Sequence, residues 1–218
     1  MPLKHPLASE RTVERLILYR KRLSGVAAES KRFVYSYEIG ALSGVTPSQV
    51  RRDLMCIGYS GNPNRGYDTN GLIESIEEFL YEPSSRSVVL VGAGNLGRAI
   101  LAYFSDRHPR LSVVAAFDTD PAKIDRVILG CRCFPMTELA SVARAHQVRV
   151  AIMTVPAAAA QDVADTLVEA GVKGLVNFAP TRLRTPQDVY VEDIDLALSL
   201  EKVSFFARQI IPVERKGV

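Results

Sequence analysis

Hydrophobic positions recur every three or four residues in three stretches near the start of the chain, which is the spacing of amphipathic helices. The first predicted helix runs from Ser9 to Gly25, and a shorter one follows over 36–44. A third helix begins at Thr46, with Pro47 in its first turn, where the missing N–H costs nothing. The tight turn between the second and third helices, and the polar, basic outer face of the third, predict a helix-turn-helix.

The segment after these helices, "YSGNPNRGYDT" (59–69), is rich in turn-forming residues and predicts a β-hairpin wing. Residues 1–82 are therefore expected to form a winged helix-turn-helix domain whose last helix enters a DNA major groove. An ordinary three-helix bundle with a loop is the alternative. The predicted DNA contacts are Thr46, Ser48, Gln49, Arg51, Arg52, Asn64, Arg65, Gly66 and Tyr67.

From residue 86 onward the pattern changes to short apolar runs that alternate with helical stretches. Such alternation predicts an α/β fold with a doubly wound parallel sheet, a Rossmann domain over 86–192. The break at 83–87 is the expected domain boundary. The expected strands are 88–91, 112–117, 131–134, 149–154 and 174–178, and the expected helices are 95–105, 137–146 and 157–170.

The segment "VGAGNLG" (91–97) fits the G-x-G-x-x-G fingerprint of dinucleotide sites, between an apolar strand and a helix. Asp118 ends the next strand, where a carboxylate binds the adenosine ribose and favours NAD(H) over NADP(H). Lys123 and Arg126 lie close by in the sequence, so NADP(H) stays open as the alternative. The later strand ends "MTVP" and "NFAP" would lie beside the nicotinamide. The predicted cofactor contacts are Gly92, Ala93, Gly94, Asn95, Leu96, Gly97, Asp118, Thr119, Thr154, Val155, Pro156, Asn177, Phe178 and Ala179.

The net charge of +3 is unevenly distributed along the 218 residues. Residues 1–67 carry 11 Lys/Arg and 5 Asp/Glu, whereas 68–218 carry 16 and 19, so the front of the chain suits an anionic partner. There is no apolar leader, and the most apolar stretch, 150–160, is too short and too interrupted to cross a membrane. A cytoplasmic protein with reduced thiols is expected, with Cys131 and Cys133 as core residues.

The residues available for catalysis argue against a dehydrogenase. The three histidines, His5, His108 and His146, fall in a tail, a loop and a helix end, none of them at the expected nicotinamide side. No Ser/His/Asp set or metal-ligand cluster appears, and no length remains for a substrate domain. We therefore predict a protein that is not an enzyme. A small NAD-dependent oxidoreductase and a nucleotide-binding interaction module are the alternatives.

The C-terminal segment 193–211 carries apolar residues on nearly all sides, and such a helix has to be buried. Insertion into a partner subunit would bury it, which predicts a homodimer; capping its own sheet is the alternative. The apolar residues are Ile194, Leu196, Leu198, Leu200, Val203, Phe205, Phe206, Ile210 and Ile211.

Six segments occur in a specific order and spacing between about Arg15 and Ala207: "RLILYRKRL", "GVTPSQVRRDL", "VGAGNLGRAI", "FDTDPAKI", "TVPAAAAQDVADTLVEAGVKGLVNFAP" and "VYVEDIDLALSLEKVSF". On these motifs, the chain resembles the Rex family of redox-sensing transcriptional repressors. That resemblance implies a winged helix joined to a Rossmann domain, and a homodimer with an exchanged C-terminal helix. It also implies binding to an inverted-repeat operator when NAD⁺ prevails and release when NADH rises.

The resemblance also implies a switch. Tyr103 matches a tyrosine that reports on the nicotinamide, and Asp195 matches the partner-subunit aspartate that pairs with it. Lys21 stands where the family has an arginine that exchanges with that aspartate, with Arg20 and Arg22 beside it. Two further positions depart from the family: Leu196 replaces an aromatic residue, and the wing reads "GNPNRGY" instead of G-x-R-G-x-G-Y, which displaces its arginine to 65.

Overall fold

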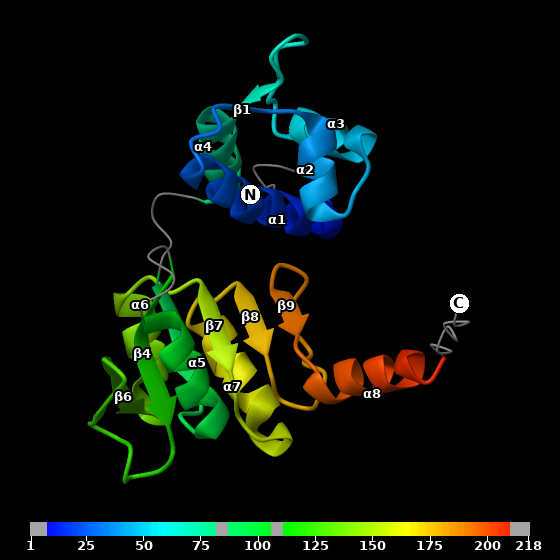
Figure 1. Cartoon of the computed structure of the whole chain (residues 1–218). Helices are drawn as coiled ribbons and strands as arrows, with labels where there is room; N and C mark the ends of the chain where they lie inside the picture. The colour runs from blue at the N-terminus through cyan, green and yellow to red at the C-terminus, as the bar shows by residue number, and fades with distance from the viewer. Residues whose placement is uncertain (1–7, 82–86, 106–110, 210–218) are drawn as a thin grey trace. The chain divides into compact units, whose positions relative to one another are not determined.

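In a computed structural model, which describes residues 8–81, 87–105 and 111–209, the chain divides into two units, Met1–Ser84 and Ser85–Val218 (Figure 1). The expected break at 83–87 falls almost entirely on residues 82–86, outside the described part. Among the described helices, none is long and apolar enough to cross a membrane.

The first unit is a winged helix-turn-helix built around one apolar core. The core gathers one face of each long helix, and its largest fully buried side chains are Leu16, Tyr19, Leu23, Ile39, Leu54, Leu72 and Ile76. The first helix runs three residues past the predicted end at Gly25, a residue that a helix tolerates at a cost of about 1 kcal/mol. The elements are α1 (Glu10–Ala28), β1 (Phe33–Val34), α2 (Ser36–Ser43), α3 (Pro47–Cys56), β2 (Tyr67–Asp68) and α4 (Thr69–Leu80).

The wing differs from the predicted hairpin. The strand at 67–68 pairs antiparallel with 33–34, which precedes the helix-turn-helix, and not with its neighbour in the chain. The rest of the wing is a loop closed by a single bridge between Asn62 and Gly66. Gly66 has a φ of +78°, and a Cβ there would lie 2.5 Å from the Val34 carbonyl oxygen, so only glycine lets the loop return against β1.

The second unit is the predicted doubly wound sheet, with seven strands in the order β5-β6-β4-β3-β7-β8-β9. The chain starts at the central β3, moves to one side, and crosses back to build the other side from β7 onward. This reversal between β3 and β7 opens a crevice at the carboxyl ends of these strands, the usual place for a ligand. The strands are β3 (Ser87–Val91), β4 (Ser112–Asp118), β5 (Val127–Ile128), β6 (Cys131–Pro135), β7 (Val150–Met153), β8 (Gly174–Asn177) and β9 (Tyr190–Asp193).

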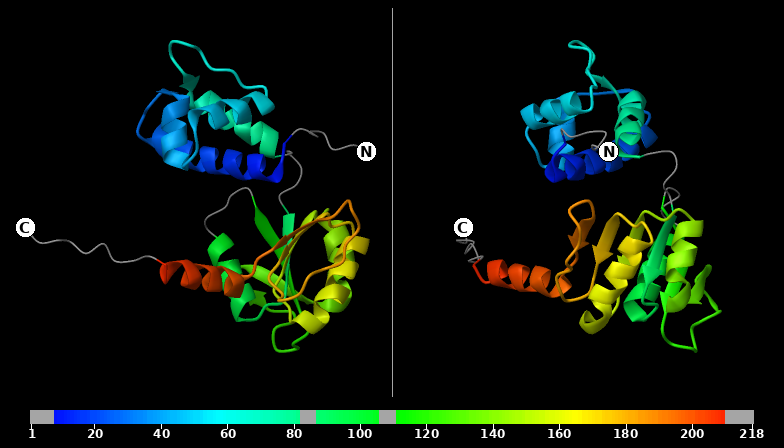
Figure 2. Two further views of the ribbon diagram at one scale, coloured as in Figure 1. Left: turned by 90° about the vertical axis from the view of Figure 1, so that its right-hand side faces the viewer. Right: turned by 180° about the vertical axis from the view of Figure 1, so that it is seen from behind.

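Helices cover the sheet on both faces (Figures 1 and 2). Leu139, Ala143, Val163 and Leu167 of α6 and α7 pack on one face, and Leu101 of α5 packs on the other. The helical elements are α5 (Asn95–Ser105), a 3-10 turn (Met136–Glu138), α6 (Leu139–Ala145), α7 (Ala157–Glu169) and α8 (Leu196–Ala207).

Two strands of the seven-stranded sheet were not predicted. β5 pairs antiparallel with β6, so one edge of the sheet departs from the expected parallel arrangement. β9 extends the parallel sheet at the other edge. Both lie at edges and are short, with two residues in β5 and four in β9, so they leave little periodic signal.

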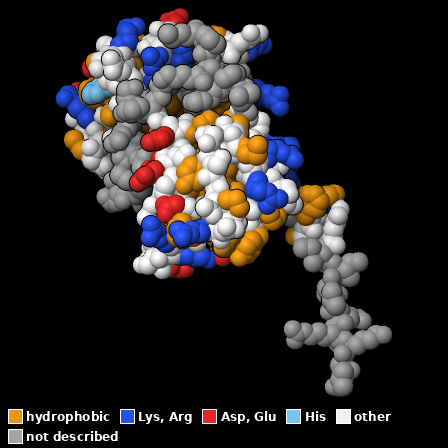
Figure 3. All heavy atoms as spheres, turned by 90° about the horizontal axis from the view of Figure 1, so that it is seen from above, with side chains coloured by type: hydrophobic (Ala, Val, Ile, Leu, Met, Phe, Trp, Pro, Cys, Tyr) orange, Lys and Arg blue, Asp and Glu red, His pale blue; other side chains and the backbone are white. Residues whose placement is uncertain are grey.

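The C-terminal helix α8 extends from the sheet (Figure 2). Its large apolar side chains are 53% to 71% exposed in the single chain, and exposed hydrophobic side chains (orange) are visible at the right of Figure 3. Ile210 and Ile211, predicted to belong to the same helix, lie outside the described residues.

Candidate functional site

The glycine loop has the shape of a phosphate cradle. Gly92 adopts a φ of +97°, and a Cβ there would lie 2.6 Å from the carbonyl oxygen of Thr154. A Cβ on Gly97 would lie 2.1 Å from the carbonyl oxygen of Gly92, so the loop packs directly on the first turn of α5. A Cβ on Gly94 would meet nothing within 4 Å. The first and third glycines thus allow close packing, while the second leaves open space at a helix N-terminus, which fits a pyrophosphate.

Asp118 lies at the end of β4 and is bound to this loop. Its Oδ2 accepts the N–H of Ala93 at 2.8 Å, and its Oδ1 accepts the N–H of Asp120 at 2.9 Å. Burial by itself raises the pKa of Asp118, but these hydrogen bonds and the ammonium group of Lys123 outweigh it and lower the pKa. Asp118 is therefore held as an anion beside the cradle. Thr119, also predicted to contact the cofactor, follows it and is exposed.

Two of the residues predicted to lie beside the nicotinamide, Thr154 and Asn177, make hydrogen bonds within the fold. The Thr154 hydroxyl donates to the Gly92 carbonyl oxygen at 2.6 Å and so secures the glycine loop. The buried Asn177 donates to the Thr181 carbonyl oxygen at 2.9 Å and to Asp193 at 2.8 Å. These bonds position the strand ends around the crevice. Val155 and Pro156, which follow Thr154, lead into α7.

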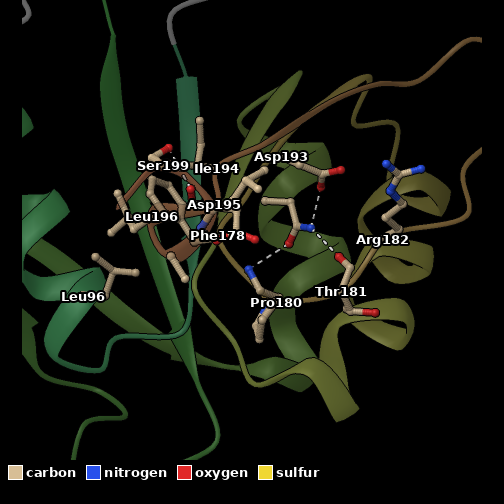
Figure 4. Close-up of a pocket in the computed structure, with 14 residues that line it drawn as sticks. Leu96, Phe178, Pro180, Thr181, Arg182, Asp193, Ile194, Asp195, Leu196 and Ser199 are labelled. Carbon is tan, nitrogen blue, oxygen red and sulfur yellow. Dashed lines mark hydrogen bonds between the residues drawn. The ribbon is translucent and has the colours of Figure 1, made fainter. Parts of the chain in front are cut away.

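A cavity of about 680 Å³ lies at the carboxyl ends of β8 and β9 (Figure 4). Leu96 approaches it from the start of α5, and Phe178 and Leu196 line its centre. This size suits a nicotinamide with its ribose. The cavity thus unites the predicted Phe178, Ala179 and Asp195 with Leu96 of the glycine motif.

Asp195 has a role that the sequence did not suggest. It is the N-cap of α8, and its Oδ1 accepts the N–H of Leu198 at 2.9 Å. A carboxylate is among the best caps, and its loss costs about 1 kcal/mol of helix stability. Any test of Asp195 must therefore separate this capping from its charge.

The histidine that the structure describes lies away from the crevice, and Cys131 and Cys133 lie in the core. His146 follows α6 and precedes β7, so it lies at the edge of the sheet opposite the crevice. His5 and His108 fall outside the described residues. Cys131 and Cys133 are buried, and burial raises the pKa of both thiols, that of Cys131 to about 11. In the part of the chain that the structure describes, no group of acidic, Cys and His residues is arranged to hold a metal ion.

The predicted DNA-reading helix is α3, and its outer face is basic. Arg51 and Arg52 are both exposed. The guanidinium of Arg51 donates to the hydroxyls of Ser36 and Ser48 at 3.0 and 3.1 Å, which links the N-termini of α2 and α3. An exposed arginine whose planar guanidinium is already oriented, as in Arg51, suits bidentate contacts to bases or phosphates.

Gln49 is turned partly inward. Its backbone N–H donates to the capping hydroxyl of Thr46 at 3.2 Å, and its side-chain amide donates to Asp53 at 2.8 Å. The predicted DNA contact by Gln49 therefore competes with this internal bond.

Asp53 is the residue that the sequence analysis missed. It is 2% exposed and receives a two-pronged salt bridge from Arg15 on α1, with Nε and Nη2 each 2.7 Å from a carboxylate oxygen. The Tyr19 hydroxyl donates to the same carboxylate at 2.8 Å. Burial by itself raises the pKa of Asp53, but these bonds and that from Gln49 outweigh it and lower the pKa. The network attaches α3 to α1 and so sets its orientation.

A signal for this network exists in the sequence. Asp53 lies on the apolar stripe of its helix, beside Val50 and Leu54. A charged residue at a core-facing position requires a buried partner, because an unpaired buried charge is costly.

The predicted wing residues divide into two groups. Asn64 and Arg65 are exposed in the turn, where both backbone N–H groups donate to the Asn62 side chain at 2.8 and 3.1 Å. Tyr67 is half-buried, with its ring 6.2 Å from that of Tyr59. The turn thus presents the first two residues outward, while Tyr67 and Gly66 hold the base of the wing.

Comparison with known proteins agrees with this arrangement. The chain is 39% identical over 196 residues to the redox-sensing transcriptional repressor Rex of Desulforamulus reducens, which covers 90% of this chain and 93% of that protein. It is 40% identical to the Rex protein of Carboxydothermus hydrogenoformans, over 92% and 96% of the two chains. This chain belongs to the Rex family. Two family models also match, described as "Putative DNA-binding protein N-terminus" over residues 8–54 and "CoA binding domain" over 84–181.

Solved Rex structures share the fold of the whole chain. The Rex-family repressor RSP is 29% identical with a TM-score of 0.82, over 93% of this chain and 94% of RSP. RSP in complex with β-NAD⁺ and operator DNA gives a TM-score of 0.86, over 93% of both chains, and RSP in complex with β-NADH gives 0.81, over 93% and 95%.

Three residues predicted to form the switch are exposed: Tyr103 on α5, which is 50% exposed, Lys21 on α1, and Asp195 before α8. Arg22, beside Lys21, is exposed as well. Arg20 is partly buried, and its Nη1 lies 3.4 Å from Glu77 Oε1, with its guanidinium 5.4 Å from the centre of the Tyr81 ring. Of these three cations, Arg20 is thus the one that the structure shows paired within its own unit.

Proposed function

We propose that this chain is a transcriptional repressor that binds an inverted-repeat operator and releases it when NADH binds. One observation carries the proposal: the same chain joins a helix-turn-helix with two exposed arginines, one of them already oriented, to a nucleotide cradle of the NAD(H) type. The proposed DNA contacts are the outward groups of α3 and the wing turn. The proposed NAD(H) contacts are the glycine loop, Asp118 and the cavity beside Phe178.

The protein acts as a sensor and not as an enzyme. The relatives that are 39% and 40% identical to this chain are named transcriptional repressors, which supports this part of the proposal. In a sensor of this kind, the nucleotide acts through the difference in its binding free energy between the two states of the protein.

The repressor works as a homodimer. In the apolar cluster on the α5 side of the sheet, the helical side chains come from α5, and Val150, Val176 and Phe178 on that face are only partly buried. The helix α8 of a second copy is apolar and exposed, and this incompletely covered face is apolar as well, so the two surfaces suit each other. Exchange of α8 between two chains would bury both surfaces, and would also bring the partner subunit's Asp195 near Tyr103.

The switch lies at the nicotinamide end of the site. The bound nicotinamide ring supplies the signal, because it carries a positive charge in NAD⁺ and none in NADH. Tyr103 holds the partner subunit's Asp195 in the DNA-binding state. In the released state Asp195 pairs instead with Lys21 or Arg22 of α1, which changes the spacing of the two recognition helices on their half-sites.

The first prediction tests the function directly. Operator fragments from upstream of the protein's own gene and of fermentative or respiratory genes should be bound by the full chain with NAD⁺ present. Adding NADH should weaken that binding by a coupling of about 1–3 kcal/mol, a 5- to 150-fold change. Fluorescence anisotropy at fixed salt would measure it. Operator binding that is equally strong with either nucleotide would contradict the proposal.

The second prediction tests the switch residue. Asp195→Asn keeps a good N-cap for α8 but removes the charge that pairs with α1. The variant should still bind NADH and operator DNA, but most of the effect of NADH on DNA affinity should be lost. The measurement is an NADH titration of the DNA complex.

A control separates this result from a loss of helix stability. Asp195→Ala removes the cap as well as the charge, so the two variants should respond alike to NADH if the charge alone matters. A wild-type NADH response in Asp195→Asn would show that another group is the switch.

A further inference from the structure

Asp118, the carboxylate proposed to select the nucleotide, has the ammonium group of Lys123 beside it. Lys123 Nζ lies 3.0 Å from Asp118 Oδ2 and 3.5 Å from Asp120 Oδ2. Asp118 is about nine-tenths buried, whereas the Lys123 side chain is 27% exposed. The ammonium group therefore lies on the outer side of the carboxylate.

The position of Lys123 is built into the turn after β4. The backbone N–H of Lys123 donates to the Asp120 carbonyl oxygen at 3.0 Å, and the N–H of Ala122 donates to the Asp120 carboxylate at 2.9 Å. The N–H of Asp125 donates to the Cys133 carbonyl oxygen at 2.8 Å and attaches the turn to β6. A tight turn anchored at both ends orients the lysine before any ligand arrives.

This arrangement changes what the carboxylate does to a ligand. Asp118 by itself accepts ribose hydroxyls and repels a 2′-phosphate, which carries a charge of about −1.5 to −2 at pH 7. Lys123 cancels one of the two nearby negative charges, leaving −1 from Asp118, Asp120 and Lys123 together. The exposed Arg126 lies three residues further along the same turn.

We propose that Lys123 is a second determinant of nucleotide choice, which weakens the discrimination against NADPH that Asp118 imposes. Its ammonium group screens the carboxylate and contacts a phosphate on the 2′-oxygen. The chain therefore prefers NADH, by a smaller margin than Asp118 without its lysine would give. This inference rests on the proposed NADH site.

The test is the ratio of the dissociation constants for NADPH and NADH, measured on the full chain by nicotinamide fluorescence. Lys123→Met leaves both carboxylates unneutralised, so the ratio should rise by about tenfold, equivalent to ~1.4 kcal/mol. Lys123→Arg keeps the charge and should leave the ratio near the wild-type value. Asp118→Asn keeps the lysine and should lower the ratio.

A matched control is Lys173→Met, which removes another lysine of the same unit from an exposed pair with Asp188. It should not change the ratio. If Lys123 only positions Asp118, Lys123→Met will weaken NADH binding selectively and the ratio will fall. A falling or unchanged ratio overturns the inference while leaving the proposed NADH site intact. Failure of the wild-type chain to bind NADH contradicts the proposed function itself, and this inference with it.

Discussion

Asp53→Ala should destabilise the N-terminal unit by about 3 kcal/mol, because it leaves the buried Tyr19 hydroxyl and the partly buried Arg15 without their shared partner. Arg15 and Tyr19 both donate to the lost carboxylate, so the salt bridge that joins α1 to α3 would be lost. Amide hydrogen exchange resolved along the chain would localise the loss to residues 10–80. Operator binding should fall with it, since the orientation of α3 depends on this network.

The control is Asp188→Ala, which breaks the exposed pair with Lys173 in the other unit. Exposed pairs are worth about 0–1 kcal/mol, so this variant should remain close to the wild type. An equally mild effect for Asp53→Ala would contradict the role assigned to the buried network.

The same network predicts how stability depends on pH. The pKa of Asp53 is lowered in the folded state relative to about 3.9 in the unfolded chain. Such a group stabilises the fold above the unfolded pKa, and that contribution is lost as the pH falls through the folded pKa. The N-terminal unit should therefore lose stability below about pH 4, and Asp53→Asn should lose this part of the pH dependence.

The second large effect concerns DNA affinity. In the double variant Arg51→Ala/Arg52→Ala, each arginine that reads a base should cost about 1–3 kcal/mol of operator affinity. Arg51 is the stronger candidate because Ser36 and Ser48 already orient its fork. Loss of a phosphate contact would in addition reduce the slope of log affinity against log salt by about 1. Anisotropy titrations with operator and unrelated DNA at several salt concentrations would measure both.

A charge-conserving variant separates base-specific contacts from sequence-independent electrostatic binding to DNA. Arg51→Lys/Arg52→Lys keeps the positive charge but lacks the planar fork. It should bind unrelated DNA nearly as well as the wild type, yet lose preference for the operator. If the alanine variant bound the operator with wild-type affinity, neither arginine would contact the bases, and the DNA interface would have to lie on another surface.

The local pattern of apolar, polar and turn-forming residues was enough to predict the helix-turn-helix of the first unit and the doubly wound α/β sheet of the second. The helical stripes of α1 and α3, the cap at Thr46 and the strand–GAGNLG–helix segment each depend on residues within a few positions of one another. The physical reason is that helix periodicity, capping and close glycine packing are set by neighbours in the chain. The same reasoning placed Asp118 at the end of β4, and the structure brings its carboxylate against the glycine loop.

Pairings between distant residues were not accessible in this way. Asp53 meets Arg15 across 38 positions, β1 pairs with β2 around the helix-turn-helix, and β9 joins an edge of the sheet. Each contact depends on which distant segments pack together in the core. The spacing of apolar residues along the chain contains no information about such pairings.

Local sequence pattern was sufficient to predict a helix-turn-helix, a strand–glycine loop–helix segment and an apolar C-terminal helix. Only the folded chain shows that Gln49 turns toward Asp53, that Asp195 caps α8, and that Lys123 lies against Asp118. A side chain's type can be read from the sequence, but its partner depends on burial and on the neighbours that the folded chain brings within hydrogen-bond distance.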